Sequence, residues 1–511
     1  MLAWLAERLG GAGEPVPAFD PSSAGHLAPP LPLPALPGAS AEPLDRLAHA
    51  RGQGISDLVR LRTATVRRAP DAVVRPASPA DVRTVLERAA RDAFRVVVWG
   101  GGSSVTGGLN LDPDAPPTVA LDLEHASGLL DLDRESGLAT FGAGTFGPDL
   151  ETALGERGLT LGHFPQSFER STLGGWIATR ASGQESLGYG RIDDLVAGAE
   201  MIAPAGDVAV RPRPAAAVGP EPLALVLGSE GRLGVIWQAT MRVRPLPARR
   251  AVRAYLLPDW QSGVAAARAL VQGGVPLAML RLSDEPETEM AMRIGLAGHG
   301  RQAGLLRGYL RVRGRRDFGC LLLLGATGSA SDLRRAREEA RPPLAAHGAL
   351  SIGGSPGRHW LADRFRHPYL RDALLDRGYA TDTFETSAPW SRLGAVYAAV
   401  RAATPLPLLC HLSHPYRDGA SLYFTFFFRT ARDADATIAA WADAKRRVTD
   451  ALLGAGATLS HHHGIGAWHA PWYRRAVGDA TADALAAAAA SFDPAAVLNP
   501  VVFDSRDRLE V

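Results

Sequence analysis

Glycines and hydroxyl residues gather in one stretch, Arg95 to Asn110, which reads RVVVWGGGSSVTGGLN. Val96 to Val98 is a β-branched run typical of a buried strand, and it ends in three consecutive glycines. Because glycine lacks a Cβ, the backbone of Gly100 to Gly102 can bend sharply and approach a ligand closely. Its N–H groups, with the hydroxyls that follow up to Thr106, are suited to surround a phosphate or pyrophosphate. The alternative is a tight turn between strands.

Two later stretches also combine glycines with hydroxyl residues. Gly162 to Gly190 reads GHFPQSFERSTLGGWIATRASGQESLGYG, and Leu225 to Pro247 reads LVLGSEGRLGVIWQATMRVRPLP. One such loop is weak evidence, because ordinary turns use the same residues. Three of them on one scaffold are much less easily explained as turns. We therefore interpret all three as ligand-binding loops.

The second group able to do chemistry is a run of three histidines, 461 to 463. Neighbouring side chains alternate along a strand, so these three cannot all point the same way. We expect one or two of them to reach a ligand, with the rest structural. Zinc is the alternative, with His411 and His414 as further ligands. Their spacing is loose and no carboxylate pattern accompanies it, so we expect no metal site.

Short strands and helices alternate around these residues. From Pro70 the sequence predicts a strand, a helix that starts at Ser78-Pro79 and ends near Arg91, and the strand before the glycines. Further strands are expected at 119–123, 139–142 and near Met201 and Val208, with a helix over 145–155. Residues 251–455 again mix strands (254–257, 320–324, 423–429) with helices (261–271, 330–340, 433–453). That pattern is typical of a second α+β domain.

The expected fold is α+β, with four parts. Residues 1–67 form an N-terminal arm with a short helix at Leu2–Leu9, a Pro-rich extended connector and a helix over Leu44–Val66. Residues 68–247 carry the glycine loops, and 248–455 form the second α+β domain. Residues 456–511 form a C-terminal region that carries the histidine run.

Composition excludes several classes of protein. The chain has 511 residues, 46% of them hydrophobic and 21% charged, which is ordinary for a globular protein. A net charge of +2 gives no sign of nucleic-acid binding, and two cysteines do not indicate a disulfide framework. We find no signal-peptide pattern and no uncharged apolar run of 18 residues. A cytoplasmic protein is expected, with peripheral membrane contact left open.

A Rossmann dinucleotide fold is excluded. Its G-x-G-x-x-G fingerprint lies between a strand and a helix. Gly100 and Gly102 fit, but the third position is Val105. The following sequence, GLNLDPDAPP, contains three prolines and is not helical in character.

In their order and spacing, the GGGSS loop, STLGGWIATRASG and LGSEGRLGVI resemble the PCMH-type FAD-binding domain of the vanillyl-alcohol-oxidase family. The resemblance covers residues 70–247 and implies FAD between two α+β subdomains, with its pyrophosphate on the first loop. Some members attach FAD covalently through a His just after the triple glycine. Ser103 stands there in this chain, which implies non-covalent FAD. The implied cofactor-binding residues are Val98, Trp99, Gly100, Gly101, Gly102, Ser103, Ser104, Gln166, Ser167, Phe168, Glu169, Arg170, Ser171, Thr172, Thr179, Arg180, Ala181, Ser182, Glu230, Gly231, Arg232, Leu233, Gly234, Val235 and Ile236.

Two later stretches, FETSAPW from Phe384 and SHHHGIG from Ser460, resemble signatures of the alkyldihydroxyacetonephosphate synthase family. VRLRTATVRRAPDAVV near residue 65 and PLAMLRLSD near residue 280 also match, so the resemblance runs from about residue 45 onward. The family exchanges the acyl chain of acyl-dihydroxyacetone phosphate for a fatty alcohol, through a covalent flavin N5 adduct and without net oxidation. The resemblance implies the same reaction here, in ether lipid synthesis.

The resemblance also assigns roles to single residues. Tyr423, in GASLYFTFFF, matches the catalytic tyrosine, and His461–His463 match the family's histidines. A tyrosine acts as a base only if its pKa is well below about 10, which requires nearby positive charge. Arg281 matches an arginine required for activity, with a structural ion pair as the alternative. Arg371, 13 positions before Phe384, matches a substrate-binding arginine, whose fork suits a phosphate.

Departures from the family keep other functions open. Ala467 stands where the animal enzymes have lysine, and Pro415 and Arg417 alter the HLSHPYRDG segment. One alternative is a flavin-dependent 2-hydroxy-acid dehydrogenase or oxidase of the D-lactate or glycolate type. HLSHPYRDGASLY lacks the H-x-G-D-G-N strand usual in those enzymes. The other alternative is a flavoprotein without catalysis.

The implied substrate is a lipid, which enters from a lipid surface through an apolar tunnel. Leu2–Leu9 and the Pro-rich arm are our candidates for a membrane-facing part. Homodimers are common in the family, so a homodimer is one expected assembly. No nucleic-acid partner is expected.

Overall fold

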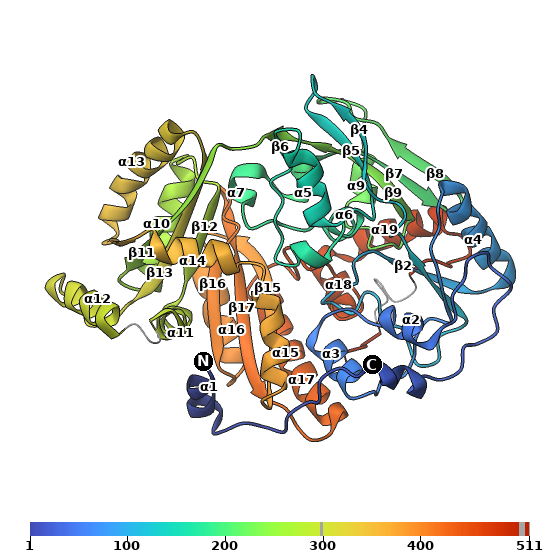
Figure 1. The fold of residues 1–511 in the computed structure, drawn as a ribbon, viewed down its shortest axis with the longest axis horizontal. Coiled ribbons are helices and arrows are strands. Elements are labelled where there is room, and N and C mark those ends of the chain that lie inside the picture. Colours follow the sequence, from blue (N-terminus) through green and yellow to red (C-terminus); the bar gives the residue numbers. More distant parts are fainter. Residues whose placement is uncertain (297–299, 500–505, 510–511) are drawn as a thin grey trace.

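The computed structural model describes residues 1–296, 300–499 and 506–509. Two α+β parts lie side by side, and segments from both ends of the chain cover their edges (Figure 1). The helices are α1 (Leu2–Leu9), α2 (Pro43–Ala48), α3 (Ile55–Arg62), α4 (Pro79–Asp92), α5 (Gly147–Gly155), α6 (Leu173–Thr179), α7 (Ser186–Tyr189), α8 (Ile192–Leu195), α9 (Leu223–Val226), α10 (Trp260–Gln272), α11 (Glu285–Gly295), α12 (Gly300–Val312), α13 (Ala330–Ala346), α14 (Ser355–Asp363), α15 (Leu370–Leu375), α16 (Leu393–Ala403), α17 (Ala434–Gly454), α18 (Ala470–Val477) and α19 (Asp479–Phe492).

The first part of the fold contains two sheets. A parallel sheet has the order β1-β3-β2, with β1 (Ala72–Val74), β2 (Arg95–Trp99) and β3 (Thr118–Asp122). An antiparallel sheet has the order β4-β5-β9-β7-β8, with β4 (Leu129–Asp133), β5 (Leu138–Gly142), β7 (Val196–Ala203), β8 (Gly206–Val210) and β9 (Val235–Arg242). Two short strands, β6 (Leu159–Thr160) and β10 (Arg244–Pro245), pair with each other. The two-subdomain arrangement predicted from the glycine loops is confirmed.

Local sequence signals explain the elements on either side of the first loop. Ser78 caps α4, since its hydroxyl accepts the N–H of Asp81 at 3.3 Å, and Pro79 takes the first helical position. Ala93 ends the helix with a left-handed φ of 58°. No helix follows β2 before β3, as the exclusion of a Rossmann fold requires.

The second part is built on one antiparallel sheet of order β14-β11-β13-β12-β16-β17-β15. Its strands are β11 (Arg249–Leu257), β12 (Met279–Ser283), β13 (Cys320–Gly328), β14 (Leu350–Gly353), β15 (Tyr379–Pro389), β16 (Leu408–Ser413) and β17 (Gly419–Arg429). Helices α10, α13, α16 and α17 contribute buried residues to the core on one face. The predicted α+β character of this part is confirmed.

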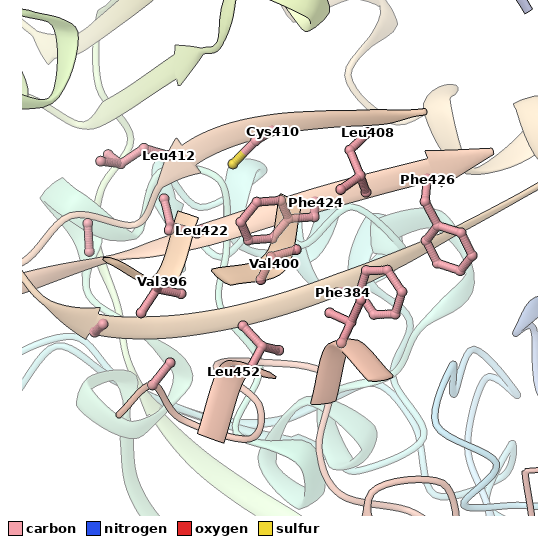
Figure 2. Close-up of a cluster of buried hydrophobic side chains, with 14 of the residues drawn as sticks. Phe384, Val396, Val400, Leu408, Cys410, Leu412, Leu422, Phe424, Phe426 and Leu452 are labelled. Atoms are coloured by element: carbon pink, nitrogen blue, oxygen red, sulfur yellow. The ribbon is translucent and has the colours of Figure 1, made fainter. Parts of the chain in front are cut away.

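Along β17, every second side chain enters the core on one face of this sheet, and the residues between them lie on the other face. Leu422, Phe424 and Phe426 pack against α16 and α17 (Figure 2), and burial of each such side chain contributes about 1.5–3 kcal/mol. Because side chains alternate along a strand, Tyr423 points to the opposite face. A slip of one residue would bury Tyr423 and expose the phenylalanines, so this core specifies the register that places the site.

The N-terminal helix α1 is part of the fold. Trp4 and Leu5 are buried against Leu409 and Phe427, on the same face of the sheet as Tyr423. The proposal that Leu2–Leu9 faces a membrane is therefore wrong for the apolar side of this helix, because that side covers the sheet.

The single helix predicted over Leu44–Val66 is also wrong. Helix α2 ends at Ala48 and α3 begins at Ile55. The turn between them presses on the first glycine loop, where a Cβ on Gly52 would lie 2.3 Å from the carbonyl oxygen of Ser104. This close approach excludes a continuous helix.

The end of the described chain returns to the first part. Leu498 forms a parallel bridge with Val96, where Val96 N–H donates to Val497 O at 2.8 Å and Asn499 N–H donates to Val96 O at 2.9 Å. The C-terminal region thus pairs along the edge of β2, the strand that leads into the first glycine loop. Among the described residues, no helix is long and apolar enough to cross a membrane.

Candidate active site

Four side chains form a row across one face of the seven-stranded sheet. Glu385 on β15 lies opposite Tyr423 on β17, and Tyr423 lies opposite His411 on β16. Arg281 on β12 shares their face, since it lies two residues before Ser283, the partner of His411. The rings of Tyr423 and His411 are stacked, with centroids 4.8 Å apart. Strand pairing therefore brings together residues that are far apart in the sequence.

Arg281 and Glu287 determine the tautomer of His411. Arg281 pairs with Glu287 Oε1 at 2.7 Å and donates from Nη1 to His411 Nε2 at 3.3 Å. A guanidinium has no acceptor, so the proton of His411 is on Nδ1, which donates to Glu287 Oε1 at 3.2 Å. Burial and the guanidinium lower the pKa of His411 to about 4. The ring next to Tyr423 is therefore neutral at pH 7, and the ion pair considered as an alternative for Arg281 exists inside the site.

The histidine run is a turn held by one carboxylate. Glu385 accepts the backbone N–H groups of His461, His462 and His463 at 2.7, 3.1 and 3.0 Å, and the hydroxyl of Ser460 at 2.5 Å. Burial opposes ionisation of Glu385, but the histidines and Ser460 hold its pKa well below the usual range. Glu385 lies in the FETSAPW stretch but was not among our site residues. It sets the position of all three rings.

Two of the three rings face Tyr423. His462 is stacked with it at 5.9 Å, and His463 meets it edge-on at 5.6 Å. His461 points away, with Nε2 2.7 Å from the Tyr416 hydroxyl and Nδ1 2.9 Å from His462 Nδ1. This agrees with the expectation that the three side chains would not share one direction.

Tyr416, His461 and His462 form a chain of hydrogen bonds. Each of the two hydrogen bonds contains one proton, and both can point in either of two directions along the chain. In one arrangement Tyr416 donates to His461, and in the other it accepts from His461. Burial lowers the pKa of both histidines, so the chain is neutral at pH 7. Such a chain can take a proton at His462 and release one at Tyr416.

The pKa of Tyr423 is shifted upward, which disfavours the deprotonated form that a base needs. Burial raises its pKa to about 12, and Glu385 acts in the same direction. Arg371 is the neighbouring cation that lowers it. The positive charge that base catalysis requires is therefore only partly supplied by the protein itself.

The three glycine loops interlock. A Cβ on Gly101 would lie 2.1 Å from Arg170 O, and a Cβ on Gly100 would lie 2.5 Å from Thr172 Oγ1. Glu230 N–H in the third loop donates to Ala178 O at 3.0 Å. Backbones approach this closely only where side chains are absent, so the predicted cofactor segments form one compact cradle.

A C-terminal segment, 464–468, contacts two of these loops. Glu230 accepts the N–H groups of Ile465 and Gly466 at 2.7 and 2.8 Å, and burial raises its pKa to about 7. Trp468 N–H donates to Thr106 O at 3.0 Å in the first loop. This segment directly follows the histidine turn, so the histidine turn and the cradle share one support.

The second loop also contacts the histidine turn. Arg191 donates from Nη2 to His461 O at 3.0 Å and to Arg180 O at 2.9 Å, and from Nε to Ser182 Oγ at 3.1 Å. Arg191 therefore connects two predicted cofactor-binding residues, Arg180 and Ser182, to His461. The sequence gave us no reason to select Arg191.

The side chains of several predicted cofactor-binding residues contact other parts of the protein. Phe168 packs on Trp176 and Phe365, while Glu169 and Arg170 contact the hydroxyl of Tyr369. Val235 and Ile236 are buried in β9. At these positions only the backbone can face a ligand in the cradle.

Arg371 lies between the N-terminal arm and the site. It donates from Nη1 to Gln53 O and from Nε to Pro368 O at 3.1 Å, and its side chain is half-buried. Gln53 N–H donates in turn to Ser104 O at 2.6 Å. The arm therefore joins the predicted phosphate-binding arginine to the first loop, a connection that the sequence did not reveal.

The histidine cluster could also be considered as a metal site. Among the described residues, Glu385, His461 and His462 offer ligand atoms within 4.8 Å of one another. Both oxygens of Glu385 already accept hydrogen bonds from the turn. The donor set therefore suits an anchored turn, and the absence of a metal stays a prediction.

The first prediction concerns the cradle. In Gly101→Ala the new Cβ meets backbone on the facing loop, and overpacking of this kind costs about 1–3 kcal/mol. We expect the purified variant to contain less FAD, measured as the ratio of absorbance at 450 and 280 nm. Gly108→Ala in the same loop is the control, since its Cβ would meet neighbours only at 3.5–3.8 Å. Equal FAD content in all three proteins would contradict the cradle.

Comparison with known proteins identifies the class first. A family model described as "FAD binding domain" matches residues 70–210, and one described as "FAD linked oxidases, C-terminal domain" matches residues 246–502. The glycine loops contact one another through their backbones, and loops of this kind provide the backbone N–H groups that a pyrophosphate needs. The chain is an FAD-dependent enzyme of the FAD-linked oxidase class, and FAD is its cofactor.

Comparison with individual relatives identifies the family within this class. The chain is 31% identical to an alkyldihydroxyacetonephosphate synthase of Dictyostelium discoideum, over 89% of this chain and 77% of that protein. It is 32% identical to the synthase of Trypanosoma brucei brucei, over 89% and 76%. A solved alkyldihydroxyacetonephosphate synthase superposes with a TM-score of 0.82 at 28% identity, covering 98% of this chain and 91% of the other. The chain belongs to the alkyldihydroxyacetonephosphate synthase family.

Proposed function

We propose that this protein exchanges the acyl chain of acyl-dihydroxyacetone phosphate for a fatty alcohol. The observation that carries the proposal is the row Glu385–Tyr423–His411–Arg281, with the histidine turn above Tyr423 and the FAD cradle attached to the same turn. The row offers a hydroxyl, neutral imidazoles and cations in one place. Removal of a C–H proton, deprotonation of an alcohol and departure of a carboxylate need these groups.

When bound in the cradle, FAD would supply an electrophilic ring system for an exchange without net oxidation. As its phenolate, Tyr423 takes a proton from the substrate carbon and returns one to that carbon when the product forms. His462 takes the proton of the alcohol, and the chain through His461 carries a proton to Tyr416. A proton on His462 also places positive charge next to the Tyr423 ring, which lowers the raised pKa of that hydroxyl.

Overall the C–O bond to the acyl group breaks, a C–O bond to the alkyl chain forms, and the acyl chain leaves as a carboxylate. Arg371 binds the substrate phosphate, and FAD is held without a covalent bond, because Ser103 replaces the histidine used elsewhere. These roles rest on the resemblance and on where the side chains lie.

The test is incubation of the FAD-loaded protein with palmitoyl-dihydroxyacetone phosphate and labelled hexadecanol. We expect palmitate release and incorporation of the label in equal amounts, with no consumption of oxygen. Anaerobic mixing with D-lactate should leave the flavin spectrum unchanged. Rapid bleaching by D-lactate, without release of palmitate, would favour the 2-hydroxy-acid dehydrogenase instead.

A second prediction concerns Arg371. In Arg371→Ala the substrate loses a charged hydrogen-bond partner worth about 1.5–3 kcal/mol, so KM for the phosphate substrate should rise about 10–100-fold, with a smaller change in kcat. Arg377→Ala is the control, because that arginine is exposed and donates to Ala373 O at 2.8 Å, at the end of its own helix region. An unchanged KM would remove Arg371 from phosphate binding.

A further inference from the structure

Glu230, in the third glycine loop, has an unusual backbone conformation. Its φ of 48° lies in the left-handed region, which residues with a side chain adopt only where their surroundings hold them there. Its N–H donates to Ala178 O in the second loop at 3.0 Å, and its carbonyl oxygen accepts from Asn499 Nδ2. Two separate segments therefore fix the backbone of Glu230. Strain of this kind gathers where a residue has a functional role.

The side chain of Glu230 is bound to the end of the histidine turn. Its Oε1 accepts the N–H of Ile465 at 2.7 Å, and its Oε2 accepts the N–H of Gly466 at 2.8 Å. The fit is tight, because a Cβ on Gly464 would lie 3.1 Å from Oε1. Since Gly464 directly follows His463, the place of the Glu230 carboxylate determines where the turn ends.

The same contact lies against the first loop. A Cβ on Gly466 would lie 2.2 Å from Thr106 O, and a Cβ on Gly108 would lie 3.8 Å from Glu230 Oε2. Glu230 and its partners are thus in contact with all three of the predicted cofactor loops. Hydrogen bonds weaken steeply with distance and angle, so a movement of the third loop away from the first would break those to residues 465 and 466.

We propose that Glu230 is a positioning residue that couples FAD binding in the cradle to the placement of the histidine turn. With FAD bound, the three loops stay together, the carboxylate meets its two N–H groups, and the turn presents His462 and His463 to Tyr423. Without FAD the loops separate more readily and the turn loses this anchor. Coupling is reciprocal, so a change that breaks the contact also weakens FAD binding. The inference goes beyond the proposed reaction, since it applies whichever substrate the site takes.

The test is hydrogen–deuterium exchange measured by mass spectrometry, with and without FAD, in peptides that cover residues 100–108 and 461–468. In the wild type we expect FAD to slow exchange in both peptides. Glu230→Gln keeps the size of the side chain but turns an NH2 group toward one of the two N–H groups. FAD should still protect 100–108, while its protection of 461–468 should fall at least about fivefold. Gly464→Ala should act in the same way through its Cβ, and Glu200→Gln, at an exposed position of β7, is the control.

Each outcome decides the proposal. Equal protection of 461–468 by FAD in the wild type and both variants would overturn it, as would protection of 100–108 alone in the wild type. If removal of FAD unfolds the protein, the FAD-loaded forms are compared, and faster exchange of the variants in 461–468 alone is expected. If both variants lose FAD, the wild-type result decides. The dissociation constant of FAD should rise about fivefold or more in each variant, and an unchanged constant would overturn the coupling. No turnover is measured, so failure of the proposed reaction would leave this inference standing.

Discussion

Tyr423→Phe should abolish the exchange of acyl for alkyl groups while FAD stays bound. The substitution removes only the hydroxyl, and the stacked ring that contacts His411 and His462 remains. Loss of a positioned acid–base group typically lowers the rate about 10²–10⁴-fold. The measurement is release of palmitate from palmitoyl-dihydroxyacetone phosphate, together with the flavin spectrum of the variant.

Tyr255→Phe on β11 is the matched control, since it removes a hydroxyl from the same sheet outside the row. We expect it to react like the wild type. If Tyr423→Phe turns over at the wild-type rate, Tyr423 has no role in proton transfer, and the histidine turn must supply the base. If it loses FAD, the substitution has damaged the fold and the rate says nothing about the base.

Glu385→Ala should cost both stability and activity. The variant leaves three backbone N–H groups of the histidine turn, one buried and two partly buried, without their acceptor. Each unsatisfied donor costs about 1–3 kcal/mol, so the free energy of unfolding should fall by at least about 3 kcal/mol. Urea unfolding and palmitate release measure the two effects. Glu338→Ala, on exposed α13, is the control and should change neither.

The lowered pKa of Glu385 predicts how the stability of the protein depends on pH. Its pKa in the folded protein lies well below the ordinary 4.5, so its carboxylate stabilises the fold above about pH 4.5. That contribution is lost as the pH falls through the depressed pKa. Glu385→Gln, which cannot ionise, should show a smaller loss of stability between pH 5 and the acid limit. The same acid dependence in both proteins would contradict the role of the carboxylate.

The fold could be predicted because its signals are local. The Ser78-Pro79 helix start, the β-branched run before the glycines and the alternation around Tyr423 each show over a few residues. The break after α2 could not be predicted in this way. It depends on Gly52 meeting Ser104 O, a contact between segments about fifty residues apart.

The sequence predicted candidate residues that the structure brings together, but it did not predict the residues that support them. Tyr423, Arg281 and the histidines lie within matched stretches, and the sheet brings them together. Glu385 stood in one of those stretches, but its role depends on three backbone N–H groups that a strand and a distant turn bring together. Glu287, in α11, gave no signal, because its partners Arg281 and His411 come from β12 and β16.

The bridge between Val96 and Leu498 has a consequence for biosynthesis. A ribosome completes the three glycine loops roughly 210 residues before it reaches the segment that holds the histidine turn and its support. Contacts of such long sequence separation form late in folding. The growing chain therefore carries an unfinished cradle for more than two fifths of its translation, and stable capture of FAD must await the residues near 465–499. Ribosome-bound chains stalled before that segment should retain little flavin.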